Sequence, residues 1–329
     1  MPTVGVDLGL DDVRTAQERI AGRARRTPLL AAGELSRRVG ARTVLKAENL
    51  QLTGSFKVRG AFNRLAQLSD AERAAGVVAA SAGNHAQGLA FAARELGIKA
   101  TAVMPAGAPL SKIAAVKQYG AEVVLAEGSY DDAKHTADQL ARDEGMTIVH
   151  AFDHPQVVAG QGTVGLEIAE DAAAMGIHVD AVVTPCGGGG LMAGIATAIK
   201  ALSPETEMWG AEPEDFDDTR RSLAAGSRVG ADPAGTSICD ALMSPMPGEL
   251  TFAINRKLAA GIVAVPETSV AVAMRDAAAH LKLIVEPGGA AGFAALSSGE
   301  IELAGRTIAV VLSGGNVDMD LFARLVAAI

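Results

Sequence analysis

Short apolar runs alternate along the chain with longer segments in which apolar residues recur every three or four positions. Residues 77–82 (VVAASA) have the composition of a buried strand, and residues 84–97 have helical spacing and end at Gly97, a residue typical of helix C-termini. Strands and helices continue to alternate as far as residue 152. Parallel strands need a crossover connection, which is usually a helix. The pattern therefore predicts a small parallel sheet over residues 77–152.

A second and larger series of the same kind runs from about residue 156 to residue 329. The segments that predict strands are 179–185 (VDAVVTP), 207–213 (EMWGAEP) and 307–315 (TIAVVLSGG), and those that predict helices are 187–202 and 320–329, with an apolar and mainly helical stretch at 271–296. The expected fold class is therefore α/β, with two open, mostly parallel twisted sheets flanked by helices.

Composition and charge exclude several classes of function. Of the 329 residues, 49% are hydrophobic and 3% are aromatic, which favours close packing of helices on sheets. The net charge of −9 would repel a nucleic acid backbone. Cys186 and Cys239 have neither the spacing of a zinc site nor that of a disulfide framework. The first residues, MPTVGVDLGLDDVRT, lack the basic and then apolar pattern of a secretory leader, and no uncharged run is long enough to cross a bilayer, so neither a leader nor a membrane span is expected. We expect a cytoplasmic enzyme whose partners include neither nucleic acid nor membrane.

The run PCGGGGLMAG (185–194) follows a predicted strand and begins a predicted helix. Four consecutive glycines there would expose backbone N–H groups to an anion, so phosphate is the natural ligand. The run is not a P-loop, because Ile195 and Ala196 stand where lysine and serine or threonine are required. A dinucleotide site remains an alternative, since 188–193 match G-x-G-x-x-A and Glu212 ends the next strand. A glycine turn that serves packing alone is the third interpretation.

Other candidate residues lie in polar turns. The turn SAGNHAQG (81–88) leads into a helix whose N-terminal amides could hold a carboxylate, but Ser81 and Asn84 are equally suited to capping that helix. Ser313, at the end of a later strand, is either a turn hydroxyl or a hydrogen-bond donor. Lys57, in the run LTGSFKVRGAF, is either a solvated surface charge or a reactive amine. These alternatives stay open on the residues alone.

Taken together, the motifs resemble the pyridoxal-phosphate enzymes of fold type II, in the branch that contains threonine dehydratase, serine dehydratase and serine racemase. The motifs, in family order, are SFKVRGA (55–61), SAGNHAQG (81–88), AGQGT (159–163), PCGGGGLMAG (185–194), VEPGGA (285–290) and LSGGNVD (312–318). The resemblance runs from about Thr27 to the end of the chain. It implies a large domain of residues 1–52 and 153–329, a small domain of residues 53–152, and a homodimer.

The resemblance also implies a role for each motif residue. Lys57 would bind the cofactor aldehyde and, once displaced, act as the base at the substrate Cα. Ser313 would face the ring nitrogen, where a hydroxyl does not stabilise a protonated pyridinium. The full set of implied cofactor contacts is Phe56 against the ring, Lys57, Asn84 at the ring hydroxyl, Gly187, Gly188, Gly189 and Gly190 at the phosphate, Leu191, Glu286 and Ser313. The implied contacts of the substrate carboxylate are Ser81, Ala82, Gly83, Asn84 and His85.

The implied reaction is loss of water from L-threonine or L-serine, followed by hydrolysis to a 2-oxo acid and ammonia. Racemisation is less expected, because racemases of this branch have a serine where this chain has Ala82, and alanine transfers no proton. The chain also departs from the family at Ala241, where glycine is usual, and at Ala151, where proline is usual. These departures keep 3-hydroxyaspartate and phenylserine open as substrates. The charge of −9 disfavours an acidic substrate unless an arginine lies in the site.

A run of acidic residues, AEPEDFDD (211–218), reads by itself as a solvated loop. The resemblance to the racemase branch implies instead that Glu212, the backbone carbonyl of Phe216 and Asp218 bind a divalent cation. Oxygen ligands suit Mg²⁺ or Ca²⁺. The chain ends one helix after LSGGNVD, so feedback inhibition by isoleucine through a further domain is not expected.

Overall fold

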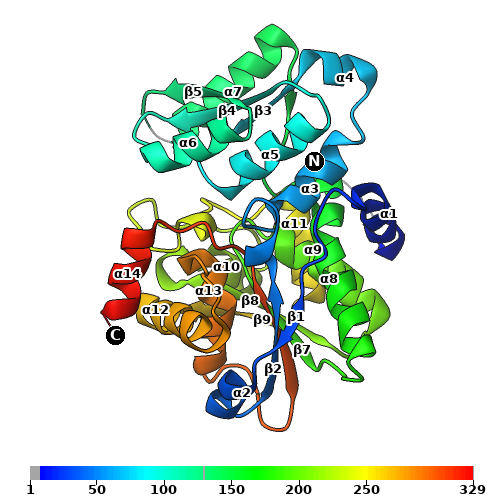
Figure 1. Cartoon of the computed structure of the whole chain (residues 1–329), viewed down its shortest axis with the longest axis vertical. Helices are drawn as coiled ribbons and strands as arrows, with labels where there is room; N and C mark the ends of the chain where they lie inside the picture. Colours follow the sequence, from blue (N-terminus) through cyan, green and yellow to red (C-terminus); the bar gives the residue numbers. More distant parts are fainter. Residues whose placement is uncertain (1–7, 129, 329) are drawn as a thin grey trace.

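The computed structural model describes residues 8–128 and 130–328, which form two open sheets with helices on their faces (Figure 1). The larger described sheet has six strands in the order β1-β2-β10-β7-β8-β9. Their bounds are β1 Leu29–Ala31, β2 Arg42–Ala47, β7 Ala181–Pro185, β8 Glu207–Pro213, β9 Gly261–Val265 and β10 Thr307–Leu312. Only the pairing of β1 with β2 is antiparallel.

The smaller described sheet has four strands in the order β5-β4-β3-β6, all parallel. Its strands are β3 Val77–Ala80, β4 Ala100–Pro105, β5 Glu122–Ala126 and β6 Thr147–Ile148. The small parallel sheet predicted over residues 77–152 is therefore confirmed, and so is the fold class.

Helices connect and cover the strands. Their bounds are α1 Leu10–Ile20, α2 Gly33–Val39, α3 Lys57–Leu65, α4 Asp70–Ala75, α5 Asn84–Glu95, α6 Leu110–Gln118, α7 Tyr130–Glu144, α8 Pro155–Ala174, α9 Gly190–Leu202, α10 Asp218–Ala225, α11 Glu249–Leu258, α12 Glu267–Asp276, α13 Pro287–Ala294 and α14 Met319–Ala327. Short turns of helix are η1 Glu48–Leu50, η2 Glu214–Phe216, η3 Asp240–Leu242, η4 Ala277–Leu281 and η5 Ala295–Ser297.

The larger sheet is more extensive than the sequence pattern predicted. Its first two strands lie before residue 50, and β9 was not recognised either. Strand β2 reads RTVLKA and contains Lys46, which is fully buried. Acidic side chains pair with its amine inside the protein. Because a charged residue is not expected in a buried strand, the sequence pattern did not predict β2. The stretch 271–296 is divided into α12, the π-helical turn η4 and α13. Residue 329, at the end of the predicted last helix, lies outside the described residues.

The helix α3 lies where the two sheet units meet (Figure 1). It packs on α5, which belongs to the smaller sheet, and on α8, which lies against the larger one. The predicted domain boundaries, at 52/53 and 152/153, fall just before α3 and α8 and stay predictions.

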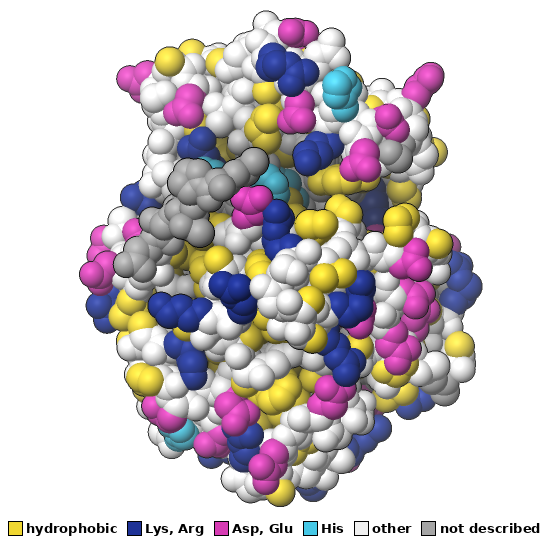
Figure 2. Space-filling view, turned by 180° about the vertical axis from the view of Figure 1, so that it is seen from behind, with side chains coloured by type: hydrophobic (Ala, Val, Ile, Leu, Met, Phe, Trp, Pro, Cys, Tyr) yellow, Lys and Arg dark blue, Asp and Glu magenta, His cyan; other side chains and the backbone are white. Residues whose placement is uncertain are grey.

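On the face that Figure 2 shows, acidic and basic side chains are interspersed over both parts of the molecule. No helix among residues 8–128 and 130–328 is long and apolar enough to cross a membrane.

Candidate active site

A cavity of about 580 Å³ lies at the carboxyl ends of strands from both sheets. This is the edge at which open parallel sheets bind ligands. The turn after β3, the glycine loop after β7 and the loop after β10 all line the cavity, together with the start of α3. Every residue predicted to contact cofactor or substrate lines it: Phe56, Lys57, Ser81, Ala82, Gly83, Asn84, His85, Gly187, Gly188, Gly189, Gly190, Leu191, Glu286 and Ser313. Their individual roles stay predictions.

Lys57 is the first residue of α3, and its side chain lies in the cavity. Its Nζ donates a hydrogen bond to the carbonyl oxygen of Ala151 over 2.9 Å and lies 5.2 Å from the centre of the Phe56 ring. Burial lowers the pKa of Lys57 to about 8, although the nearby carboxylate of Glu286 opposes that change. The amine is therefore partly neutral, and nucleophilic, near neutral pH.

The backbone just before Lys57 is anchored to the loop after β10. Ser55 pairs with Gly314 in an isolated antiparallel bridge, and the N–H of Phe56 donates to the carbonyl of Ser313 over 3.2 Å. This pairing connects α3 to the end of β10, and β10 is one of the two central strands of the larger sheet.

Helix α11 holds the glycine loop in place through two side chains. The Oγ1 of Thr251 donates to the carbonyl of Gly188 over 2.7 Å, and the Nδ2 of Asn255 donates to the carbonyl of Gly189 over 3.2 Å. In a planar trans peptide the C=O and the next N–H point in opposite directions. Turning these carbonyls toward α11 therefore points the N–H groups of Gly189 and Gly190 away from it, at the start of α9.

Close contacts require glycine in this loop. A Cβ on Gly188 would lie 2.5 Å from the ring of Phe152, and one on Gly187 would lie 3.0 Å from the backbone of Leu242. Gly189 has φ +85°, a conformation that favours glycine. The loop thus combines amides that point away from α11 with a helix N-terminus, which is an arrangement that binds phosphate.

Asn84 and Glu286 are joined inside the cavity. The Nδ2 of Asn84 donates to Oε1 of Glu286 over 2.6 Å, and Asn316 donates to Oδ1 of Asn84 over 2.8 Å. Burial raises the pKa of Glu286 to about 8, with a further increase from Asp240. The capping interpretation of Asn84 is wrong, because Gly83 is the N-cap residue and the amide of Asn84 bonds these two side chains instead.

His85 lines the cavity as a neutral residue. Its Nε2 donates to the carbonyl of Val149 over 2.8 Å, and burial lowers its pKa to about 3. A histidine charge therefore does not contribute to carboxylate binding by this turn, whereas N–H groups at the start of α5 are suited to it.

Ala151 and Ala241, the two departures from the family, line the cavity together with the residues before them, His150 and Asp240. Sequence reasoning missed other polar residues that line it: Lys112, Lys134, Arg228 and Asn316. Lys112 of α6 and Asp240 of η3 form an ion pair between the two sheet units. Arg228 donates to the carbonyl of Pro247 and to the exposed carboxylate of Glu249. Asn316 belongs to the recognised motif LSGGNVD, and Gln87 and Gln161, which also line the cavity, belong to SAGNHAQG and AGQGT; these amide side chains were the available signal.

The acidic run does not line the cavity. Both carboxylate oxygens of Glu212 accept backbone N–H groups, from Thr219 and Arg220 at the start of α10. Asp218 is fully buried, and neither of its carboxylate oxygens has a hydrogen-bond partner in the described structure. Burial raises the pKa of Glu212 to about 8 and that of Asp218 to about 7. Within the described part of the chain, no group of three or more His, Cys, Asp or Glu side chains is arranged to hold a metal.

Two sequence interpretations are thereby corrected. The run 211–218 is not a wholly solvated loop, since Glu212, Phe216 and Asp218 are buried. Glu212 also does not line the cavity that the glycine loop lines, so it is not placed to hold the ribose of a dinucleotide bound there.

Comparison with known proteins agrees with this geometry. The family model for pyridoxal-phosphate dependent enzymes matches residues 20–314. The L-threonine ammonia-lyase of Thermotoga maritima is 42% identical over 321 residues, which cover 97% of this chain and 78% of that protein. The L-threo-3-hydroxyaspartate ammonia-lyase of a Pseudomonas species is 42% identical over 314 residues, which cover 95% of this chain and 97% of that protein. The crystal structure of a threonine deaminase from T.th. has a TM-score of 0.89 at 43% identity, covering 94% of this chain and 99% of that one.

The residues present fit pyridoxal phosphate: a partly neutral lysine lies in the same cavity as a glycine loop that suits a phosphate. The chain belongs to the pyridoxal-phosphate dependent enzymes of fold type II. Within that class it is an ammonia-lyase of the threonine dehydratase family.

Proposed function

We propose that this enzyme dehydrates and deaminates L-threonine, L-serine or both, giving a 2-oxo acid and ammonia. The observation that carries the proposal is the amine of Lys57, which has a pKa lowered to about 8 and lies in the cavity that the glycine loop lines. The threonine ammonia-lyase among the relatives supports this choice of substrate.

The residues of the chain supply binding and proton transfer. When bound, pyridoxal phosphate would supply a ring that withdraws electrons from the Cα of the substrate. Gly187 to Gly190 would hold its phosphate, and the amides of residues 81–85 would hold the substrate carboxylate. The neutral amine of Lys57 would accept the Cα proton. Loss of this proton and of hydroxide from Cβ removes one water, and addition of one water to the released enamine gives the 2-oxo acid and ammonia.

The first test is Lys57→Ala. Because Lys57 is a single residue at the edge of a cavity, the variant should fold, and it should lose both borohydride trapping of the cofactor and turnover. Residual activity above about one hundredth of the wild-type rate would contradict the role of Lys57, since a general base contributes a factor of about 10² to 10⁴.

Arg228 favours a second substrate, 3-hydroxyaspartate. Its side chain lines the cavity, and a guanidinium can form a bidentate contact with the side-chain carboxylate of this substrate. The hydroxyaspartate ammonia-lyase among the relatives supports it as well. Kinetics on threonine, serine, 3-hydroxyaspartate and phenylserine would rank the substrates. Arg228→Gln should raise KM for 3-hydroxyaspartate at least tenfold and leave KM for threonine within about twofold, if about 1.4 kcal/mol of carboxylate binding is lost. Equal effects on both substrates would rule out this contact.

We also propose that Glu212, the carbonyl of Phe216 and Asp218 bind Mg²⁺ or Ca²⁺. The buried and unpartnered oxygens of Asp218 support this, because an uncompensated buried carboxylate is costly and hard cations prefer oxygen ligands. Cation at a hundredfold excess over Kd should stabilise the fold by about 2.7 kcal/mol. Asp218→Asn should remove this response in thermal unfolding. A melting temperature that chelator leaves unchanged would contradict the site.

The homodimer and the domain division are proposals that rest on the family resemblance. Sedimentation equilibrium of the purified chain would test the first. Limited proteolysis near residues 52 and 152 would test the second, since domain boundaries are cleaved preferentially.

A further inference from the structure

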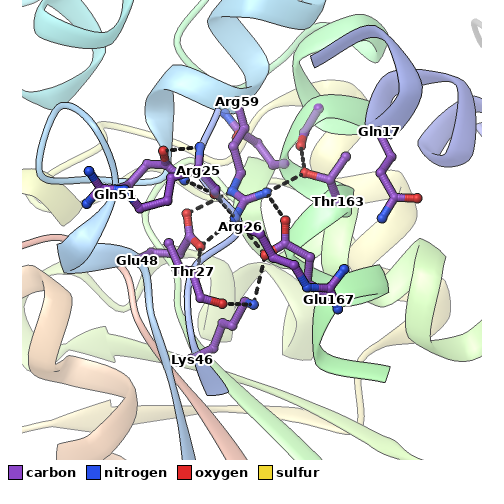
Figure 3. Close-up of polar contacts among 12 residues, drawn as sticks. Gln17, Arg25, Arg26, Thr27, Lys46, Glu48, Gln51, Arg59, Thr163 and Glu167 are labelled. Atoms are coloured by element: carbon purple, nitrogen blue, oxygen red, sulfur yellow. Dashed lines mark hydrogen bonds and ion pairs between the residues drawn. The ribbon is translucent and has the colours of Figure 1, made fainter. Parts of the chain in front are cut away.

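The helix that begins with Lys57 carries a second cation, Arg59, which is 1% exposed. Figure 3 shows its guanidinium between Glu48 on one side and Glu167 with Thr163 on the other. Nε and Nη2 donate to the two oxygens of Glu48, each over 2.8 Å. Nη1 and Nη2 donate to the two oxygens of Glu167 over 2.7 and 2.9 Å. The guanidinium thus makes two forked contacts at once.

These partners come from separate parts of the chain. Glu48 follows β2 of the larger sheet, whereas Glu167 and Thr163 belong to α8. Nη2 of Arg59 also donates to the carbonyl of Arg25 over 3.1 Å. The start of α3 is therefore connected to the sheet, to α8 and to the segment after α1.

From Arg59 toward the protein surface, negatively and positively charged side chains alternate. Lys46 lies 2.8 Å from Glu167 and 3.2 Å from Asp171, and Asp171 in turn pairs with the half-exposed Arg26. Burial by itself would raise the pKa of Glu48, but the charge and hydrogen bonds of Arg59 outweigh it, so the pKa lies below its ordinary value. Arg59 consequently holds Glu48 in its charged form despite complete burial.

Arg59 does not line the cavity, and helical geometry explains why. Two residues along an α-helix correspond to a rotation of about 200°, so Arg59 lies on nearly the opposite face of α3 from Lys57. Next to it, Gly60 meets Gly160 of α8 so closely that a Cβ on Gly160 would lie 2.7 Å from the Cα of Gly60. The glycine contact sets the distance between α3 and α8, while the two forks restrict rotation and sliding of α3.

Stability alone is a weak reason to bury such a network. Taking ions out of water costs about as much as their mutual attraction returns, and apolar replacements are often no less stable. What a forked ion network supplies, and an apolar contact does not, is one defined orientation.

We propose that Arg59, through Glu48 and Glu167, is a positioning residue that fixes the orientation of α3 and thereby aims the amine of Lys57 into the cavity. This inference rests on the proposed role of Lys57. It assigns the network to the geometry of the reaction and not to the binding of any ligand.

The test compares Arg59→Lys with wild type at a temperature well below unfolding. Lysine keeps the charge but loses both forks. Misplacing a reacting group by about 1 Å costs about a hundredfold in rate. We expect kcat to fall by 10-fold to 100-fold with KM changed less than threefold, and borohydride trapping of pyridoxal phosphate on Lys57 to slow similarly. Glu48→Gln and Thr163→Val both leave Arg59 in place. Glu48→Gln should lower kcat and the trapping rate less than Arg59→Lys does, and Thr163→Val should lower them least.

The matched control is Arg26→Gln, which removes a cation at the solvent end of the same network. It should lower the melting temperature slightly and leave the trapping rate unchanged. If folded Arg59→Lys and Glu48→Gln trap the cofactor and turn over at wild-type rates, the positioning role is refuted. If wild type itself fails to trap the cofactor on Lys57, the proposed function is refuted instead. If Arg59→Lys does not fold, Glu48→Gln and Thr163→Val decide, because wild-type kcat and trapping in both would again refute the role.

Discussion

The pH dependence of cofactor capture depends directly on the environment of Lys57. Only a neutral amine attacks an aldehyde, and burial lowers the pKa of Lys57 from 10.5 to about 8. At pH 7.5 roughly a quarter of the amine would be neutral, compared with about one part in a thousand for an ordinary lysine. The folded protein should therefore capture pyridoxal phosphate roughly two hundred times faster than an unperturbed amine of equal accessibility and equal intrinsic nucleophilicity would. The rate should rise about tenfold per pH unit below pH 7, about fivefold between pH 7 and pH 8, and level off near pH 9.

Stopped-flow absorbance of cofactor-free protein mixed with pyridoxal phosphate, between pH 6 and pH 10.5, measures this rate. The same reaction with Nα-acetyllysine separates the titration of the cofactor from that of the protein. Glu286→Gln should move the midpoint to lower pH, because the carboxylate of Glu286 raises the pKa of Lys57. A rate that keeps increasing to pH 10 would show that Lys57 is solvated and would refute the reasoning.

The other predictions concern the walls of the cavity. Thr251→Val removes the donor to the carbonyl of Gly188, a bond worth about 1 kcal/mol, so titration with pyridoxal phosphate should show Kd increased by about fivefold; an unchanged Kd would mean that the loop holds its shape without α11. Gly188→Ala should weaken cofactor binding more strongly, because the new Cβ would lie 2.5 Å from the Phe152 ring, and adding Phe152→Leu should restore part of the affinity; a double variant no better than the single one would disprove that clash. Because Ala82 transfers no proton, chiral chromatography of a reaction with L-serine should find D-serine formed at under a hundredth of the rate of pyruvate, and comparable rates would reinstate the racemase.

The parts of the site that sequence could predict lie in short contiguous motifs. The glycine loop, the turn after β3 and the start of α3 each contain glycines or polar residues at strand ends, where a parallel sheet leaves its ligand edge. In these motifs the residues that would contact a ligand are the same residues that form the turn, so one sequence pattern predicts both the turn and the binding site. The strand β3 and the helix α5 were predictable for the same reason, since a buried apolar run is followed by helical periodicity and then by Gly97.

What could not be predicted depends on contacts between distant segments. Lys112 and Asp240 are separated by 128 positions, and nothing in either segment marks them as partners. Strand β2 was missed because its Lys46 looks like a surface residue until the acidic side chains of α8 come to lie around it. A hydrophobicity pattern records single residues, whereas a buried ion pair is stable only when both members are present.

The environment of Lys57 also explains why a glutamate lies inside the cavity. Burial brings Lys57 and Glu286 toward the same pKa of about 8, one from above and one from below. Near that pH, the neutral pair and the ion pair are therefore close in free energy. Asn84 donates to Glu286 and keeps part of the negative charge stabilised, while the charge of Asp240 opposes it. Under the proposed function, the negative charge of Glu286 would stabilise the ammonium that Lys57 forms when it accepts a proton from a substrate Cα.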